Sequence, residues 1–145
     1  MAEGFGIGEL SRLGQCKVPT IRYYEAVGLM PRPARSAGGQ RRYGPAALAR
    51  LRFIQRCRRL GFAQGAIREL LELQGQPGED CDGVMAIARA HVGEIEQRIA
   101  QLDALREELR RLLDACAGGR IGDCRLIEQL AAGAAPQGTG EKPRP

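Results

Sequence analysis

The sequence has no tryptophan, and its few tyrosines and phenylalanines make up only 4% of the 145 residues. This scarcity argues against an all-β sandwich and predicts a core formed mainly by aliphatic packing between helices. No apolar run approaches the roughly 20 residues that cross a bilayer, and residues 1–10 lack the regions of an export signal. We therefore expect a cytoplasmic protein without a membrane partner, too short to be a multidomain enzyme.

Histidine is also scarce. The only one, His91, falls within a predicted long helix, where we expect a packing residue rather than a metal ligand. A thiol enzyme with Cys116 or Cys124 as nucleophile is the alternative from another functional class, but it has no recognisable base or oxyanion site. We predict that the protein is not an enzyme.

Acidic residues are few in the first half of the chain. Residues 1–73 contain 13 lysines and arginines against 5 aspartates and glutamates, a net charge of +8, whereas the remainder carries −3. Such asymmetry indicates a half that binds nucleic acid, joined to a half with another task.

Two short helices joined by a tight turn are predicted near the N-terminus. Apolar residues at helical spacing end at Gly14, which we expect to close the first helix in the left-handed conformation. A second helix opens near Pro19 and stops at Gly28. This is the helix-turn-helix layout, and the prolines, glycines and arginines that follow it indicate a basic wing.

Two more helices are expected after the wing. The third begins at Pro45 and ends at Gly61, and the fourth stops before residues 74–78, which contain glycine and proline. The positions predicted to be buried are Leu48, Leu51, Phe53, Ile54, Leu60, Ile67, Leu70 and Leu71.

Residues of the second helix and the wing are the candidate DNA contacts. A recognition helix presents its N-terminal residues to base edges, while arginines and hydroxyl groups hold phosphates. For either tyrosine of the second helix, packing in a small core is the competing interpretation. The candidates are Lys17, Thr20, Arg22, Tyr23 and Tyr24 in the helix and Arg35, Arg41, Arg42 and Tyr43 in the wing.

Residues 80–115 are predicted to form one long helix, because proline is absent from them. Apolar residues such as Ile95, Leu102 and Leu109 repeat every seven positions, so this helix requires a partner helix. The expected organisation is mainly α: a DNA-binding domain at 1–73, a linker at 74–79, a dimerization helix at 80–115, a loop with a short helix at 116–131, and a disordered tail at 132–145.

Three cysteines point to a metal site. Cys81 and Cys116 share the seven-residue line but lie about 50 Å apart along one helix, so only antiparallel packing of two copies brings them together. Cys124 follows Cys116 across a spacer with three glycines, which lets both sulfurs approach one point.

Three thiolates suit a soft or borderline cation such as zinc, cadmium, lead or mercury. The alternative is that these thiols are small buried hydrophobes, as we expect for Cys16 and Cys57. Asp114 and Asp123 adjoin the thiols and would either donate an oxygen or, as we favour, cap a helix.

The sequence resembles the MerR family of bacterial transcription regulators. The resemblance rests on VPTIRYYEAVGLMP at 18–31, GGQRRY at 38–43 and LRFIQRCRRLGF at 51–62, and it extends over about residues 7–130. It implies a winged helix-turn-helix domain, a long antiparallel dimerization helix, and a homodimer that binds double-stranded promoter DNA. It further implies that inducer binding distorts an overlong promoter spacer and so aligns it for RNA polymerase.

The cysteine triplet Cys81, Cys116 and Cys124 is similar to that of the heavy-metal-sensing branch. Copper sensors of the family place serine at the position of Cys81, and zinc sensors add a second cysteine and a histidine in the loop, where this chain has neither. The resemblance therefore implies a divalent cadmium, lead, mercury or zinc ion as inducer at a metal-resistance promoter. Sensing of Cu(I) or of redox state is the alternative.

Overall fold

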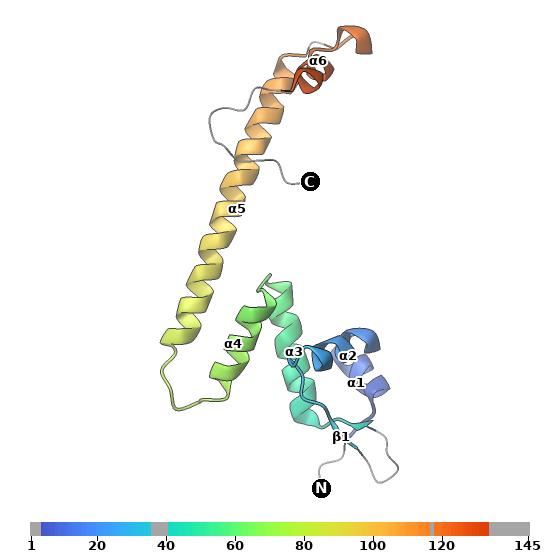
Figure 1. Cartoon of the computed structure of the whole chain (residues 1–145), viewed down its shortest axis with the longest axis vertical. Helices are drawn as coiled ribbons and strands as arrows, with labels where there is room; N and C mark the ends of the chain where they lie inside the picture. Colours follow the sequence, from blue (N-terminus) through green and yellow to red (C-terminus); the bar gives the residue numbers. More distant parts are fainter. Residues whose placement is uncertain (1–3, 36–40, 117, 134–145) are drawn as a thin grey trace. The chain divides into compact units, whose positions relative to one another are not determined.

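The structure is a computed structural model that describes residues 4–35, 41–116 and 118–133. The described chain is mainly helical, and its contacts divide it into two compact units with the boundary after His91 (Figure 1). The predicted tail falls almost entirely outside the described residues, as does the tip of the predicted wing at 36–40.

Helices α1 (Ile7–Gly14) and α2 (Val18–Ala26) form the expected helix-turn-helix and pack against each other. Pro19 occupies the first turn of α2, where its missing N–H costs no hydrogen bond. After α2, Gly28 adopts a φ of +80°, and the backbone N–H groups of Leu29 and Met30 both donate to the carbonyl of Tyr24. Glycine favours this left-handed turn because it has no Cβ to clash.

The prediction that Gly14 closes α1 in the left-handed conformation is wrong. Gln15 adopts that conformation, with φ +49°, whereas Gly14 is helical and buried. A Cβ on Gly14 would lie 2.6 Å from Cδ2 of Leu51, so this glycine permits close packing of α1 on α3. Helix α1 does end at Gly14, as predicted, but glycine is required there by the packing against Leu51 and not by the turn.

Two short strands form the base of the wing. Strand β1 (Ala34–Arg35) pairs antiparallel with β2 (Arg41–Arg42), with Ala34 opposite Arg42 and Arg35 opposite Arg41. The next residue, Tyr43, exchanges two backbone hydrogen bonds with Phe5, which fastens the wing to the start of the chain.

Helices α3 (Pro45–Arg59) and α4 (Gln64–Gln74) pack together and complete the core of the first unit. The predicted positions Leu51, Ile54, Ile67, Leu70 and Leu71 are buried, as are Cys16 and Cys57. The prediction that Leu60 is buried is wrong, because Leu60 follows α3 as its C-cap and is 54% exposed.

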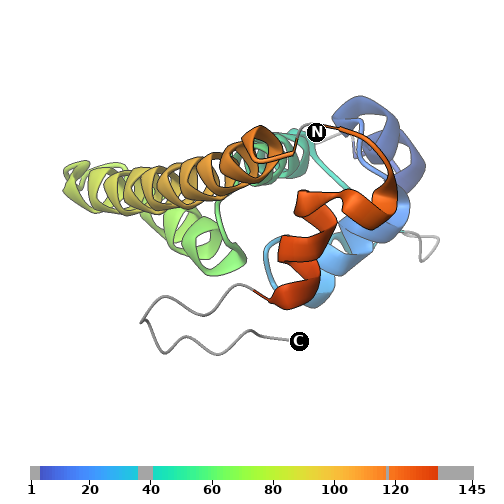
Figure 2. The same ribbon diagram turned by 90° about the horizontal axis from the view of Figure 1, so that it is seen from above.

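The long helix α5 (Asp82–Asp114) spans 33 residues without a break (Figure 2). Its first turns belong to the first unit: Ile87 packs against the core, and the ring of His91 lies 4.4 Å from that of Phe62. His91 Nε2 is also 2.8 Å from the carbonyl oxygen of Leu60, so the expected packing role of His91 is confirmed.

Beyond α5, a short 3-10 helix η1 (Ile121–Asp123) leads into helix α6 (Arg125–Ala132). A search of the described residues finds no helix with the length and apolarity that a membrane span requires.

Candidate DNA-binding surface and metal centre

Polar side chains of α2 and of its N-cap, Lys17, are accessible to solvent. Lys17, Arg22 and Tyr23 are exposed, and Thr20 is half-buried. The hydroxyl of Tyr23 donates to Oε1 of Gln64, at the first residue of α4, over 3.0 Å. These residues therefore present positive charge and a hydroxyl group along α2, groups of the kind that contact phosphates and bases.

A concave surface of about 420 Å³ is lined by residues of α1, of α2 and of the segment that follows α2. Arg22 and Arg32 line it together with Ile7, Glu25 and Ala26. Two guanidinium groups at one hollow favour an anionic partner.

Tyr24 and Tyr43, both predicted to contact DNA, lie in the core of the first unit. Tyr24 is 7% exposed, and burial raises the pKa of its phenol. Tyr43 is 1% exposed and donates its hydroxyl to the buried Glu25 of α2 over 3.0 Å. This bond joins the base of the wing to α2.

Two arginines that sequence reasoning did not single out hold the segment after α2. Arg50 of α3 donates to the carbonyl of Leu29 at 2.6 Å, and Arg68 of α4 donates to the carbonyl of Val27 at 2.7 Å. Nothing in the sequence distinguishes them from the neighbouring arginines, because their acceptors are brought near only by folding.

The wing arginines are placed by the short strands. Arg35 and Arg41 are paired residues of β1 and β2, and Arg42 is exposed with its Nη1 donating to the carbonyl of Gly4 at 3.2 Å.

The loop after α5 brings two cysteines together. The sulfurs of Cys116 and Cys124 are 3.7 Å apart, and both residues are half-buried. Gly118 and Gly119 adopt φ values of +85° and +112°, which turn the chain back toward α6. The prediction that glycines allow these two sulfurs to approach one point is confirmed for this pair.

The pKa of the Cys116 thiol is lowered. The backbone N–H of Gly118 is the largest cause, followed by the hydrogen bond from Cys124 and then the N–H groups of Leu126 and Arg125 in the first turn of α6, while desolvation opposes them. Thiolate is the form that binds metal and attacks electrophiles, so the fold prepares Cys116 for either role.

The third predicted ligand, Cys81, stands at the other end of α5. It is exposed, and its carbonyl accepts the first helical hydrogen bond from Met85. Within the part of the chain that the structure describes, no group of three or more His, Cys, Asp or Glu side chains could hold a metal ion. Within the described part of one chain, only the pair Cys116 and Cys124 is therefore available as neighbouring thiol ligands. Asp114 and Asp123 are both exposed to solvent.

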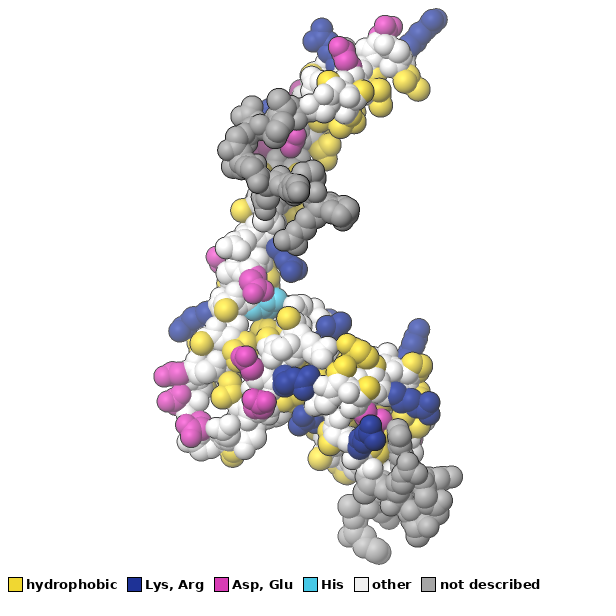
Figure 3. Space-filling model, in the orientation of Figure 1, with side chains coloured by type: hydrophobic (Ala, Val, Ile, Leu, Met, Phe, Trp, Pro, Cys, Tyr) yellow, Lys and Arg dark blue, Asp and Glu magenta, His cyan; other side chains and the backbone are white. Residues whose placement is uncertain are grey.

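Helix α5 exposes an apolar face, part of which is visible in Figure 3. None of its residues is buried. The exposed hydrophobic side chains include the predicted seven-residue line, with Leu102 64% exposed. They are Val84, Met85, Val92, Ile95, Ile99, Leu102, Leu105, Leu109 and Leu113.

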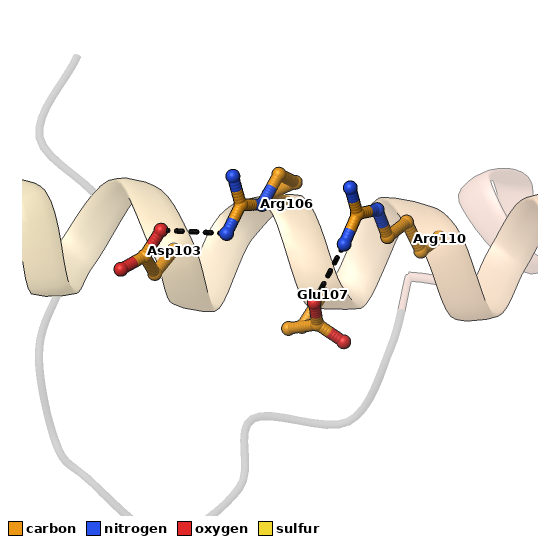
Figure 4. Close-up of polar contacts among 4 residues, drawn as sticks. All are labelled: Asp103, Arg106, Glu107 and Arg110. Carbon is orange, nitrogen blue, oxygen red and sulfur yellow. Dashed lines mark hydrogen bonds and ion pairs between the residues drawn. The ribbon is translucent and has the colours of Figure 1, made fainter.

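Two ion pairs join exposed charged side chains of α5. Arg106 contacts Asp103 at 2.9 Å and Arg110 contacts Glu107 at 3.2 Å, both three residues apart (Figure 4). Such exposed pairs are worth about 0–1 kcal/mol each. The helix is therefore amphipathic, with an apolar face that a single chain leaves uncovered.

Two family models match the chain. One described as "MerR HTH family regulatory protein" matches residues 5–74, and one described as "MerR, DNA binding" matches residues 48–112. Together they cover the helix-turn-helix, the wing, α3, α4 and nearly all of α5.

Full-length relatives are also found. The HTH-type transcriptional regulator ZntR of Escherichia coli (strain K12) is 38% identical over 133 residues, which are 90% of this chain and 94% of the relative. The HTH-type transcriptional regulator HmrR of Rhizobium leguminosarum bv. viciae is 40% identical over 128 residues, covering 88% and 98%.

Among solved structures, the lead(II) complex of the transcription regulator PbrR691 from Ralstonia metallidurans CH34 superposes with a TM-score of 0.79. It is 38% identical, and the match covers 87% of this chain and 98% of that one.

Proposed function

This chain belongs to the MerR family of helix-turn-helix regulatory proteins, and on that premise we propose that it is a homodimeric, metal-responsive regulator of a promoter. It binds DNA and is not an enzyme. The observation that carries the metal response is the pair of sulfurs on Cys116 and Cys124, 3.7 Å apart at the end of α5.

The sulfur separation favours a bent arrangement around the ion. With metal–sulfur bonds of about 2.3 Å, two sulfurs 3.7 Å apart subtend an angle close to tetrahedral. A linear two-sulfur site, as Cu(I) adopts, needs sulfurs about 4.6 Å apart at the same bond length. The loop therefore suits a three- or four-coordinate divalent ion, for which cadmium, lead, mercury and zinc are the candidates.

We propose that the third thiolate comes from a second copy of the chain. A three- or four-coordinate ion leaves an open position on the Cys116–Cys124 pair, and the remaining candidate thiol, Cys81, is exposed at the opposite end of α5. Antiparallel packing of two α5 helices through their apolar faces would cover those faces and carry Cys81 to the partner's loop. Each dimer would then hold two equivalent sites.

DNA binding is assigned to the exposed surface of the first unit. We propose that Lys17, Thr20, Arg22 and Tyr23 contact DNA from α2, and that Arg35, Arg41 and Arg42 contact the phosphate backbone from the wing. Tyr24 and Tyr43 would not touch DNA; from the core they would fix the position of the wing relative to α2.

Removing one hydroxyl group distinguishes an exposed tyrosine that contacts DNA, Tyr23, from a core tyrosine, Tyr43. Tyr23→Phe should weaken operator binding with little effect on unfolding, because its hydroxyl is exposed. Tyr43→Phe removes the buried hydrogen bond to the Glu25 carboxylate and should lower the free energy of unfolding by about 1–3 kcal/mol. Fluorescence anisotropy with operator DNA and urea unfolding measure the two effects; equal stability losses in both variants would contradict this assignment.

The start of α5 offers a route from metal to DNA. A Cβ on Gly83 would lie 3.2 Å from Cδ1 of Leu73, so the first turn of α5 packs closely on the end of α4. A metal ion that draws Cys81 toward a partner would act directly on this contact. Metal induces only if it binds the DNA-distorting conformation more tightly than the other.

Metal titration of the purified, reduced protein tests the ligand set. Thiolate-to-metal absorption with cadmium or lead should saturate at two ions per dimer. Cys81→Ser, Cys116→Ser and Cys124→Ser should each lower the affinity, while Cys57→Ala, at a core thiol, should not. Unchanged affinity in Cys81→Ser would overturn the three-thiol site.

Mixed dimers decide whether the site is shared. Neither Cys81→Ser chains nor Cys116→Ser chains retain a complete site in their homodimers. A heterodimer of the two has one complete site if the ligands come from different chains, and none if they come from the same chain. Recovery of one tight ion per heterodimer is therefore the expected result.

A further inference from the structure

We propose that the Cys116–Cys124 pair is also a binding site for monosubstituted trivalent arsenicals, complete within a single chain. Such compounds carry one carbon substituent on arsenic and two positions that exchange for sulfur. The structure provides two thiols and no third within reach in the described chain, which is the donor number that this class takes.

The separation of the two sulfurs fits this ligand. Trivalent arsenic is pyramidal because a lone pair occupies its remaining position, so its two sulfur partners must lie near one another rather than on opposite sides. At 3.7 Å the sulfurs of Cys116 and Cys124 are close to van der Waals contact. One soft atom can therefore bond to both with little movement of the loop.

The loop also has room for the carbon substituent. A Cβ built on Gly118, Gly119 or Gly122 would meet no atom within 4 Å, so described side chains do not crowd the loop at these three glycines. Ile121, in the same loop, is 80% exposed and offers an apolar surface for an aryl group.

The reaction is balanced without an oxidant. An arsenoxide, R–As=O, condenses with the two thiols to give R–As(S)₂ and one water molecule, whose hydrogens come from the two S–H groups. Two As–S bonds replace the arsenic–oxygen bond, and arsenic stays trivalent.

The adduct would oppose metal binding, a consequence that rests on the proposed metal function. An arsenical saturated by Cys116 and Cys124 has no position left for the partner's thiol. It would therefore occupy the site without joining the two chains and block metal binding.

Phenylarsine oxide and mass spectrometry of the full chain test the binding site. We expect one phenylarsenic adduct per reduced wild-type chain, an equal adduct on Cys81→Ser, and none at equimolar reagent on the loop variants Cys116→Ser and Cys124→Ser, each made in the Cys81→Ser background so that no partner thiol can replace the one removed. Loss of the adduct in Cys81→Ser, or its persistence in both loop variants, would overturn the proposal. Circular dichroism of each variant checks that the helices are retained.

A metal titration of the adduct separates this inference from the three-thiol proposal. Wild-type protein carrying the adduct should lose cadmium binding, and a small dithiol that removes the arsenical should restore it. If Cys81→Ser forms the adduct and also binds cadmium normally, the arsenical site stands and the shared metal site fails.

Discussion

At the scale of single residues, the metal loop depends on two glycines. Gly118 and Gly119 both have positive φ, whereas Gly122 in the same loop does not. A Cβ on any of the three would meet no atom within 4 Å. A side chain at a left-handed position costs roughly 1–2 kcal/mol. Conformation rather than space is therefore what demands glycine at 118 and 119.

Substitution by alanine tests this demand. Gly118→Ala and Gly119→Ala should each weaken metal binding by about tenfold, because the loop must strain to bring the thiols together. Gly122→Ala is the matched control and should bind as wild type. Isothermal titration with cadmium measures all three, and equal affinities throughout would show that the left-handed turn does not limit the site.

The lowered pKa of Cys116 has a measurable consequence at the same scale. Alkylation requires the thiolate, so the midpoint of its pH profile should lie below that of an ordinary thiol. Burial instead raises the pKa of Cys16 and Cys57, whose profiles should shift upward. Iodoacetamide labelling followed by peptide mass spectrometry gives each profile.

Cys124→Ser provides the control for this profile. It replaces the thiol that shares a hydrogen bond with Cys116 by a hydroxyl group, while the backbone N–H of Gly118 stays in place. A profile of Cys116 that lies at or above the ordinary midpoint in the wild-type protein would contradict the structure.

At the scale of elements, α5 is a helix whose apolar face is not covered by the rest of the described chain. Its apolar side chains are exposed, and its charged side chains form weak pairs such as Glu107–Arg110. Burying one leucine contributes about 1.5–3 kcal/mol, so a leucine buried in both copies of a symmetric dimer contributes twice that amount.

Leu102→Asp should therefore raise the dimer dissociation constant at least roughly a hundredfold. Arg110→Ala is the control, because it removes only an exposed ion pair and should change dimerization little. Sedimentation equilibrium measures both. A Leu102→Asp protein that stays dimeric would place the interface elsewhere.

At the scale of the whole molecule, metal, dimer and stability should be linked. A ligand that binds only the folded dimer stabilises it by about 2.7 kcal/mol per site at a concentration one hundred times its Kd. The melting temperature should thus rise with cadmium and with chain concentration together. Cys81→Ser should keep the dependence on chain concentration but lose most of the dependence on cadmium, which thermal unfolding at several concentrations would show.

Much of this protein follows from local sequence. Helix boundaries, the basic character of the first half and the apolar line of α5 are set by glycine, proline, charge and periodicity, which act over a few residues. The approach of Cys116 to Cys124 was predictable for the same reason, because only a short glycine-rich loop separates them.

The tertiary structure decided what local signals cannot. It placed Tyr24 and Tyr43 in the core, made Gly14 a packing residue, and directed Arg50 and Arg68 to the carbonyls after α2. In each case the partner lies in a different element. The role of the residue is therefore determined by which helices pack together, because burial and hydrogen bonding depend on distances in space rather than along the chain.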